Sequence, residues 1–353
     1  MHDAESSVES SGTQSCALPK VMVMVHAVHD PHLTGAPKIT AVIPTHTRID
    51  LLRRALESLS KQANAAVAVV VIDNCSPHDV RASVSAEFPH AKVVRSPRNL
   101  FFAGAVNLGA ALVRTPYLLV LNDDVVLDPA WAEAALAPLH GDPRIGSVAS
   151  KLYQAGTPGL LSSAGDHLNL NGWAGNLGWG ERDGALYDVS REVFSASGAC
   201  ALYRTCAFRE AGGFDSRFTA YLEDVDLGFR LQLLGYRCVY APGAVGVHVG
   251  GATYKARLRA LALTERNMLW NITKNFPTSL LSKHRASIVK SQSLPAPITG
   301  GNHRFAWALG KAWAMPRLPE LIRIRWEIQN RRRVSDDYVE GLLRSERVAA
   351  CHL

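Results

Sequence analysis

Short apolar runs alternate with amphipathic stretches through the first half of the chain. The run Lys38–Ile43, rich in β-forming residues, predicts a strand, and the runs Val67–Ile72 and Tyr117–Leu121 predict buried strands, because their apolar residues follow one another without a polar alternate. Between the first two runs, leucines and alanines of Asp50–Gln62 recur at helical spacing. Another strand is expected at Val93 and Val94 and one at Ile145–Ser150, with helices starting near Pro77, after Arg98 and over Pro129–Leu139. This alternation predicts an α/β fold with a mostly parallel, doubly wound sheet flanked by helices.

The pattern changes after residue 150. Residues 153–190 are rich in Gly, Asn and Trp and show no long periodic run, which is typical of a functional loop in a compact domain. Trp173 and Trp179 in this loop suit stacking on a sugar ring, but they also suit packing beneath the loop. Beyond it, strands are expected at Phe194–Tyr203 and Val239–His248, with a helix from Leu227 to a stop at Gly235 between them.

Composition sets the size and class of the protein. With 353 residues and 47% hydrophobic content, the chain can bury a core of one large or two ordinary domains. Its formal net charge of +7 indicates an anionic partner. The cysteines form no Cys-x-x-Cys pair, which favours a reducing cytosol over a zinc or disulfide framework. Residues 1–37 read as a disordered leader without the pattern of a signal peptide, and residues 38–275 as the main domain.

The most informative polar group follows the strand at Tyr117–Leu121. Asn122, Asp123 and Asp124 come directly after its last apolar residue, so they are expected at the carboxyl end of a parallel strand, where open α/β sheets bind ligands. With a divalent cation, carboxylates there can hold a diphosphate, because Mg²⁺ is bound by one or two carboxylates together with phosphate oxygens. The alternative is a polar turn that ends a core strand.

Other strand ends carry candidate ligand groups. Pro44 and Thr45 follow the first strand, and Arg48 beyond them either reaches a phosphate or lies in solvent. Asp73 follows the second strand, where it suits a base or ribose contact, or a helix cap. Asn99 precedes a helix rich in small residues, whose first amides suit a phosphate or sugar.

Three acidic residues stand at a helix start near residue 225. Glu223, Asp224 and Asp226 are favoured there by capping and by the helix dipole, and one of them is also a candidate general base. The small residues Ser197 and Gly198 let a substrate lie against the backbone.

Together these residues resemble the inverting family-2 glycosyltransferases of GT-A fold, most closely the bacterial rhamnosyltransferase-like branch that builds cell-surface polysaccharides. The resemblance covers about residues 38–275 and depends on the order and spacing of its markers rather than on any one of them. The markers are Pro44-Thr45 with Arg48, Asp73-Asn74-x-Ser76, Asn99 with Asn107, Asn122-Asp123-Asp124, Ser197-Gly198, Gly213-Phe214-Asp215, and Glu223-Asp224-x-Asp226-Leu227 with Arg230.

The resemblance implies a role for each matching position. Asp224 is the implied general base, with Glu223 beside it. Asp124 and His248 are the implied ligands of Mg²⁺ or Mn²⁺. The implied donor contacts are Pro44, Thr45, Arg48, Asp73, Asn99, Asn107, Asn122, Asp123 and Gly198, and the expected acceptor contacts are Trp173, Trp179, Tyr221 and Asp226.

Two positions depart from the family pattern. Asn122 stands where many relatives have Asp, which leaves fewer charges for a metal. Phe101 replaces the usual glycine of an Asn-x-Gly turn, which is expected to change the shape of the sugar pocket.

The last part of the chain, residues 276–353, has a different composition. From Arg304 onward, tryptophans, leucines and isoleucines are interleaved with arginines and lysines, including Arg331-Arg332-Arg333. Such a pattern predicts an amphipathic helical extension on an anionic membrane surface, while nucleic-acid binding and a solvated helix are the alternatives. The lipid-linked acceptors of similar proteins favour the membrane.

The expected function is transfer of a sugar, rhamnose by resemblance, from a dTDP- or UDP-sugar to a lipid-linked or polysaccharide acceptor, at the inner face of the cell membrane and without nucleic acid. A nucleotidyltransferase is one alternative, although it would carry a Gly-rich basic loop after the first strand, where only Arg48 is present. A carbohydrate-binding module that uses the Trp-rich loop is the other.

Overall fold

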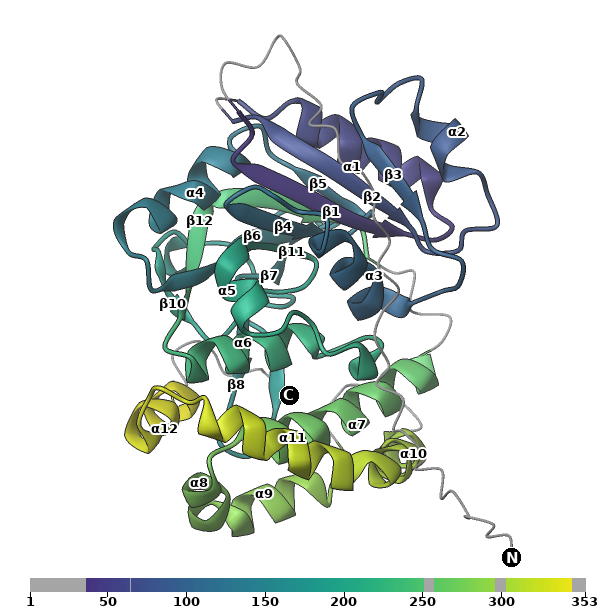
Figure 1. Cartoon of the computed structure of the whole chain (residues 1–353). Helices are drawn as coiled ribbons and strands as arrows, with labels where there is room; N and C mark the ends of the chain where they lie inside the picture. Colours follow the sequence, from purple (N-terminus) through teal and green to yellow (C-terminus); the bar gives the residue numbers. More distant parts are fainter. Residues whose placement is uncertain (1–35, 64, 251–256, 296–302, 345–353) are drawn as a thin grey trace, which may run out of the picture.

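A mixed β-sheet forms the centre of the computed structural model, which describes residues 36–63, 65–250, 257–295 and 303–344 (Figure 1). The strand order is β10-β12-β6-β11-β4-β1-β2-β3, and β5 pairs with β12 while β7 pairs with β6. Most of the leader expected at 1–37 lies outside the described residues. The strands of this sheet are β1 (Ile39–Thr45), β2 (Val67–Asp73), β3 (Lys92–Arg95), β4 (Tyr117–Leu121), β5 (Val125–Leu127), β6 (Ile145–Gln154), β7 (Leu161–Ser163), β10 (Arg191–Val193), β11 (Cys200–Arg204) and β12 (Arg237–His248).

The parallel strands end at one edge of the sheet. Strands β3, β2, β1 and β4 are parallel, and Thr45 at the end of β1 lies opposite Asp73 at the end of β2. Strand β11 runs antiparallel between β4 and β6. The expected strand over Phe194–Tyr203 is therefore too long: β11 begins at Cys200, and the residues before it form a turn at the same edge. The expected α/β fold with a mostly parallel sheet is confirmed.

Alternating side chains divide the core between the two faces of the sheet. Ile39, Ala41 and Ile43 pack with α1, α2 and α4 on one face, whereas Val42 packs with α3, α5 and α6 on the other. The helices of these layers are α1 (Ile49–Ser60), α2 (Val80–Val84), α3 (Phe101–Ala110), α4 (Trp131–Gly141), α5 (Thr205–Glu210) and α6 (Glu223–Leu233). The predicted helices are thus present, with boundaries shifted by a few residues.

The stretch 153–190 is more ordered than its composition predicts. Besides β7 it contains a small hairpin, β8 (Asp166–Leu168) and β9 (Ala174–Asn176), and a 3-10 helix at Ala185–Tyr187. These strands are only three residues long, so no periodicity in the sequence indicates them.

The C-terminal part is helical and packs on the outer side of α6. Phe229 of α6 contacts Phe276, just after α7, with ring centroids 5.5 Å apart, and α8 and α12 contribute Leu280 and Val339 to the same cluster. No helix in the described ranges is long and apolar enough to cross a membrane. The helices are α7 (Arg257–Asn275), α8 (Thr278–Lys283), α9 (Arg285–Gln292), α10 (His303–Ala314), α11 (Leu318–Asn330) and α12 (Asp336–Arg344) (Figure 1).

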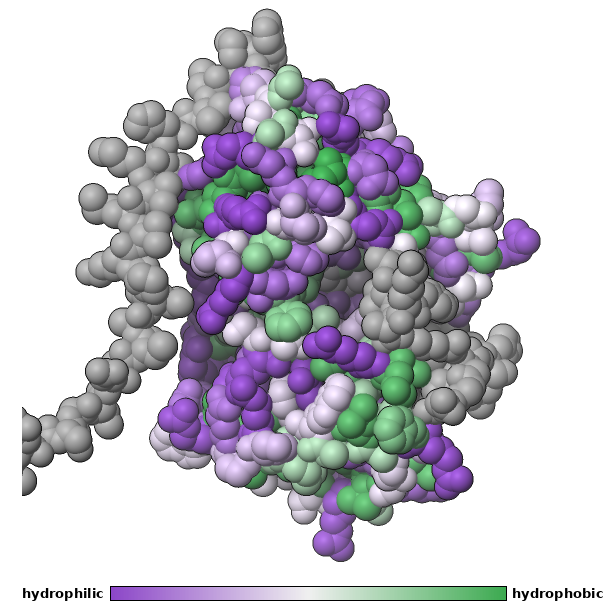
Figure 2. Space-filling model, turned by 90° about the vertical axis from the view of Figure 1, so that its right-hand side faces the viewer, coloured by the Kyte–Doolittle hydropathy of each residue, from purple (hydrophilic) through white to green (hydrophobic). Residues whose placement is uncertain are grey.

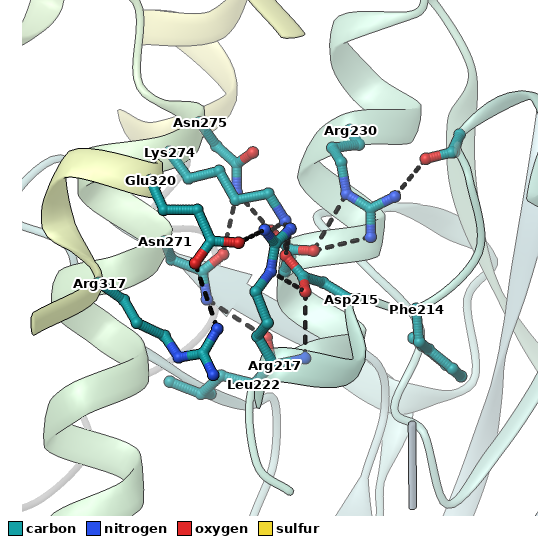
Figure 3. A network of polar contacts seen from close by, with 12 residues as sticks. Phe214, Asp215, Arg217, Leu222, Arg230, Asn271, Lys274, Asn275, Arg317 and Glu320 are labelled. Atoms are coloured by element: carbon teal, nitrogen blue, oxygen red, sulfur yellow. Dashed lines mark hydrogen bonds and ion pairs between the residues drawn. The ribbon is translucent and has the colours of Figure 1, made fainter. Parts of the chain in front are cut away.

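A buried network of charges joins α6, α7 and the turn before them (Figure 3). The Lys274 ammonium of α7 lies 2.6 Å from Asp215 and 2.7 Å from Asp226. Arg217 is the second charged partner of Asp215, and Arg230 is the second charged partner of Asp226. Burial alone would raise the pKa of Asp226, but Arg230 and Lys274 outweigh it and hold that pKa below its usual value.

Replacing Lys274 with Met should lower the free energy of unfolding by about 3 kcal/mol, because two buried carboxylates then lose a shared partner. Chemical denaturation measures this change. The matched control is Lys61→Met, since Lys61 is exposed and pairs with Glu57 at the C-terminal end of α1, and it should leave stability nearly unchanged. Equal stability of the two variants would contradict a structural role for the network.

Candidate active site

The edge of the sheet brings together residues that are distant in sequence. The backbone N–H of Asn122, after β4, donates to the carbonyl of Ala199 at 2.9 Å, which places the turn before β11 beside the acidic residues. Strand β12 ends at His248 next to β5, and the N–H of Val249 donates to the Asp124 carbonyl at 2.9 Å. Strand pairing therefore places Asn122, Asp124 and His248 at one site.

Helix α6 supplies the carboxylates on the opposite side. Asp224 accepts the N–H of Gly198 at 2.7 Å with Oδ2, and the N–H of Val225 at 2.8 Å with Oδ1. A Cβ at position 198 would lie 3.2 Å from the same Oδ2, so a larger residue would press on this carboxylate. The glycine thus permits a close approach of α6 to the sheet edge.

These groups line one cavity of about 810 Å³, a volume that suits a small ligand. The surface view shows a hollow at mid-height, above the C-terminal helices (Figure 2). Of the residues proposed from sequence, the cavity is lined by Asn122, Asp124, Trp179, Gly198, Tyr221, Glu223, Asp224 and His248.

The carboxyl groups that α6 supplies to this cavity, those of Glu223 and Asp224, bind protons more tightly than free ones. Burial and the charge of Asp224 raise the pKa of Glu223 to about 8, and Oε2 of Glu223 has no hydrogen-bond partner. Burial also raises the pKa of Asp224, although the N–H groups of Gly198 and Val225 oppose this. A raised pKa makes Asp224 a better proton acceptor when it is ionised.

The residues present fit a divalent cation held jointly with a diphosphate. Oδ1 of Asp124 is buried, lies 3.2 Å from Nε2 of His248 and has no hydrogen-bond partner. Burial raises the pKa of Asp124, but His248 and Arg48 outweigh it, so the carboxylate is ionised and available. The described residues contain no cluster of three or more His, Cys, Asp or Glu side chains, so a cation here would need oxygens from a ligand.

Thr45, Arg48 and Asp123 lie beside this pair but outside the cavity. The hydroxyl of Thr45 donates to Asp123 at 2.7 Å, and the charge of Arg48 lowers the pKa of both Asp123 and Asp124. Burial nevertheless raises the pKa of Asp123 to about 6. Pro44 precedes Thr45 at the same strand end. Their contact with a donor stays a prediction.

Asp73 is buried, and both of its oxygens already have partners. It accepts the N–H of Ser76 at 2.7 Å and pairs with Arg95 at 2.6 Å. Neither contact caps a helix, because α2 begins at Val80 and Asp79 is its N-cap, and a base contact by Asp73 remains a prediction.

Asn99 and Asn107 hold backbone rather than line the cavity. Asn99 accepts the N–H of Phe101 at 2.7 Å, and Phe101 has φ +56°, the conformation that suits the glycine of the family pattern. Asn107 both donates to and accepts from the backbone of Phe214, at 2.7 and 3.0 Å. These two bonds use one N–H and one lone pair of the amide, and a contact of Asn107 with the sugar donor stays a prediction.

The expected acceptor residues separate into two groups. Trp179 is 60% exposed, and it lines the cavity together with Tyr221. Trp173 does not line the cavity, and its indole N–H donates a hydrogen bond to the hydroxyl of Ser291 in α9. Asp226 is fully buried between Arg230 and Lys274, so acceptor binding by this residue is wrong.

Sequence reasoning missed Asp166. This residue of β8 lines the cavity, and its carboxyl accepts from Ser195 at 2.9 Å and Asn176 at 2.8 Å. Burial and the charge of Asp224 raise its pKa well above the usual value. A single Asp in a loop without periodicity gives no signal in the sequence, so only the fold brings it to the site.

Comparison with known proteins gives the class. The model of glycosyl transferase family 2 matches residues 40–212. The N-acetylglucosaminyl-diphospho-decaprenol L-rhamnosyltransferase of Mycobacterium tuberculosis is 33% identical over 222 residues, which cover 56% of this chain and 71% of that protein. The chain therefore belongs to glycosyl transferase family 2, and it is a glycosyltransferase.

Two further comparisons agree. The O-antigen biosynthesis protein RfbC of Myxococcus xanthus is 28% identical over 234 residues, covering 63% of this chain and only 18% of RfbC. The crystal structure of GalNAc-T7 with UDP, GalNAc and Mn²⁺ superposes with a TM-score of 0.57 at 15% identity, covering 86% of this chain and 58% of that one. This likeness shows the GT-A fold.

Glu223→Gln should stabilise the protein more at pH 8 than at pH 5. The folded-state pKa of about 8 exceeds the value of about 4.3 for a free Glu, so stability present at low pH is lost as the pH rises between them. The variant removes this loss and should gain roughly 1 kcal/mol or more at pH 8 by denaturant titration. Glu327→Gln, on an exposed side chain, is the control. The same change at both pH values would contradict the raised pKa.

Proposed function

We propose that this chain is an inverting, metal-assisted glycosyltransferase that moves rhamnose from a nucleotide-diphosphate donor to a lipid-linked or polysaccharide acceptor in cell-surface glycan synthesis. The single observation that carries the proposal is that the Asp124–His248 pair and the Asp224 carboxylate line one cavity. One side of this cavity suits a diphosphate, and the other suits a hydroxyl that must lose a proton.

On the donor side, Asp124 and His248 would hold Mg²⁺ or Mn²⁺ together with diphosphate oxygens. The cation would offset the negative charge that the departing nucleoside diphosphate gains. Asn122 lines the same wall and is suited to a ribose or phosphate contact through its amide. Because the Asn122 side chain is neutral, the Asp124 carboxylate would be the anionic side chain that balances the charge of the cation.

On the acceptor side, Asp224 takes the proton of the acceptor hydroxyl while that oxygen attacks the anomeric carbon. The bond between this carbon and the diphosphate oxygen breaks, and the nucleoside diphosphate leaves with the electron pair. A single displacement inverts the anomeric centre. The Gly198 amide holds Oδ2 of Asp224 in place at 2.7 Å, so the base is oriented before the acceptor binds.

The Mycobacterium relative supports the choice of sugar and acceptor, because that protein is an N-acetylglucosaminyl-diphospho-decaprenol L-rhamnosyltransferase. The exposed Trp179 and the half-buried Tyr221 at the cavity are suited to stacking on an acceptor sugar. The expected donor is dTDP-rhamnose, with UDP-sugars as the second class to test.

Asp224→Asn should lower transfer at least about 100-fold while donor affinity stays nearly unchanged, because the amide cannot accept the proton. Asp124→Ala should instead weaken Mn²⁺-dependent donor binding, since one of two metal ligands is lost. The assay measures dTDP or UDP release from dTDP-rhamnose and UDP-sugars, with a synthetic N-acetylglucosaminyl-diphospho-lipid as acceptor. Donor binding is measured separately by calorimetry.

The two variants separate the two roles. Asp188→Asn serves as the control, because Asp188 is an acidic residue that does not line the cavity. Wild-type turnover in Asp224→Asn would contradict the assignment of the base. No metal-dependent release from any donor would contradict the transferase proposal as a whole.

We further propose that the C-terminal helices dock on an anionic membrane, which would place the enzyme at the inner face of the cell membrane. Ile322 and Trp326 lie one turn apart on α11 and are 58% and 70% exposed. The lower end of the molecule shows hydrophobic and hydrophilic groups side by side (Figure 2). Aromatic and aliphatic side chains among arginines suit the headgroup region of a bilayer. The exposed set is Phe305, Trp313, Met315, Ile322 and Trp326, with Arg304, Arg317 and Arg323.

Several of the basic side chains expected on this surface instead bind acidic side chains or backbone carbonyls of the protein itself. Lys311 pairs with Glu265, and Arg325 donates to the Thr273 carbonyl. Arg332 and Arg333 also have acidic partners. The docking proposal therefore depends more on apolar insertion than the sequence pattern indicates.

The double variant Ile322→Ser/Trp326→Ser should bind vesicles of phosphatidylglycerol and phosphatidylcholine at least about 10-fold more weakly, because burial of each side chain contributes roughly 1.5–3 kcal/mol. Sedimentation with vesicles measures this. Val189→Ser is the control, since Val189 is 62% exposed in the loop region before β10. Unchanged binding of the double variant would contradict docking through α11.

A further inference from the structure

The segment from Phe218 to Leu222, just before α6, has an unusual backbone. Thr219 has φ +64° and ψ −64°, and the N–H of Ala220 donates to the Phe218 carbonyl at 2.8 Å, which makes a γ-turn of the rare, strained kind. Tyr221 and Leu222 follow with φ of +70° and +60°. Residues other than glycine rarely adopt such angles, and a β-branched residue such as Thr219 is especially disfavoured there. This backbone therefore persists only where surrounding groups hold it in place.

A buried asparagine of α7 makes hydrogen bonds that hold this backbone in place. The side-chain nitrogen of Asn267, which is fully buried, lies within hydrogen-bond distance of three carbonyl oxygens, those of Phe218, Ala220 and Tyr221, at 3.2, 2.9 and 2.7 Å. Its Oδ1 accepts from Nε of Arg266 at 2.9 Å, which fixes the orientation of the amide. A single side chain thus contacts three of the five carbonyls of the strained segment.

Neighbouring residues of α7 extend the contact to α6. Asn271 donates to the Leu222 carbonyl at 3.2 Å, and Asn275 donates to Asp226 at 2.9 Å (Figure 3). Asn267, Asn271 and Asn275 are spaced by four residues, so they form one stripe along the helix. Asparagine is a poor helix former, which indicates that the stripe is kept for these tertiary contacts.

The strained segment leads directly into the site. Ala220, Tyr221 and Leu222 line the cavity, and Glu223 and Asp224 follow without a break. If the segment relaxed to ordinary angles, the start of α6 would turn and Asp224 would leave the Gly198 amide. A displacement of about 1 Å in a reacting group can lower the rate about 100-fold.

We propose that Asn267 is a positioning residue, which holds the strained Phe218–Leu222 segment and thereby places the Asp224 carboxylate against the acceptor side of the cavity. This inference rests on the proposed function, because it assigns Asp224 the role of base. The family match ends at residue 212, before the segment and before α7.

The test combines Asn267→Ala with a glycine at the strained position. Asn267→Ala should lower kcat at least about 10-fold, because the Ala220 and Tyr221 carbonyls lose the Asn267 donor and Asp224 then loses its position, although Arg266 still donates to the Phe218 carbonyl at 2.6 Å. Adding Thr219→Gly should restore kcat to within about 3-fold of the Thr219→Gly single variant, since glycine adopts positive φ without strain. Adding Thr219→Ala should restore nothing, because alanine also removes the hydroxyl but keeps the Cβ. Thr219 does not line the cavity.

Binding and stability measurements separate positioning from general damage. The dissociation constants of dTDP and UDP with Mn²⁺ should stay within about 2-fold in Asn267→Ala, because Asp124 and His248 are held by the pairing of β5 with β12 and not by the strained segment. Thr273→Val is the control for damage to α7 itself. It removes a hydroxyl that donates to the Leu269 carbonyl of the same helix at 2.8 Å. It should keep wild-type kcat.

Each result either supports the positioning role of Asn267 or overturns it. Wild-type kcat in Asn267→Ala would overturn the inference. So would equal rescue by Thr219→Ala and Thr219→Gly, or a parallel loss of dTDP and UDP binding. Failure of the proposed function is distinguishable, because the wild-type protein itself would then release no nucleoside diphosphate from dTDP-rhamnose or UDP-sugars.

Discussion

The hydrogen bond from the Gly198 amide to the Asp224 carboxylate, 2.7 Å long, joins the two halves of the site. Gly198 belongs to the sheet edge, where parallel strands end, and Asp224 belongs to the first turn of α6. This contact places the carboxylates of α6 beside the sheet edge that carries the Asp124–His248 pair. The close approach requires a residue without a side chain at 198, because a Cβ there would press on Asp224.

The same helix must be held from its outer side. Lys274 neutralises Asp215 and Asp226 between α6 and α7, while Asn267 contacts the strained backbone just before α6. The C-terminal helices therefore do more than extend the domain, since α7 supports the segment that carries the proposed base. Helices α10 and α11 pack against α7 and expose apolar side chains outward, so the supporting layer and the proposed membrane surface are two sides of one helical layer.

Local signals in the sequence predicted much of the fold. Apolar runs marked β1, β2 and β4, and the acidic residues after β4 were expected at the sheet edge, where Asp124 now lies. Tertiary contacts decided the rest. Asn107 and Asp226 fit a family motif, yet their polar groups are used by Phe214 and by Lys274. Asp166 reaches the cavity only through a hairpin too short to leave a pattern. Neither the antiparallel insertion of β11 nor the strained backbone before α6 has a periodicity that a sequence shows.

The most direct test of the account is a crystal structure of the protein with Mn²⁺ and dTDP or UDP. The account predicts that the cation is bound by Asp124 and His248, and that the diphosphate lies in the cavity that Asp224 lines. A nucleotide bound in another part of the molecule, or a cation that does not contact Asp124, would contradict it.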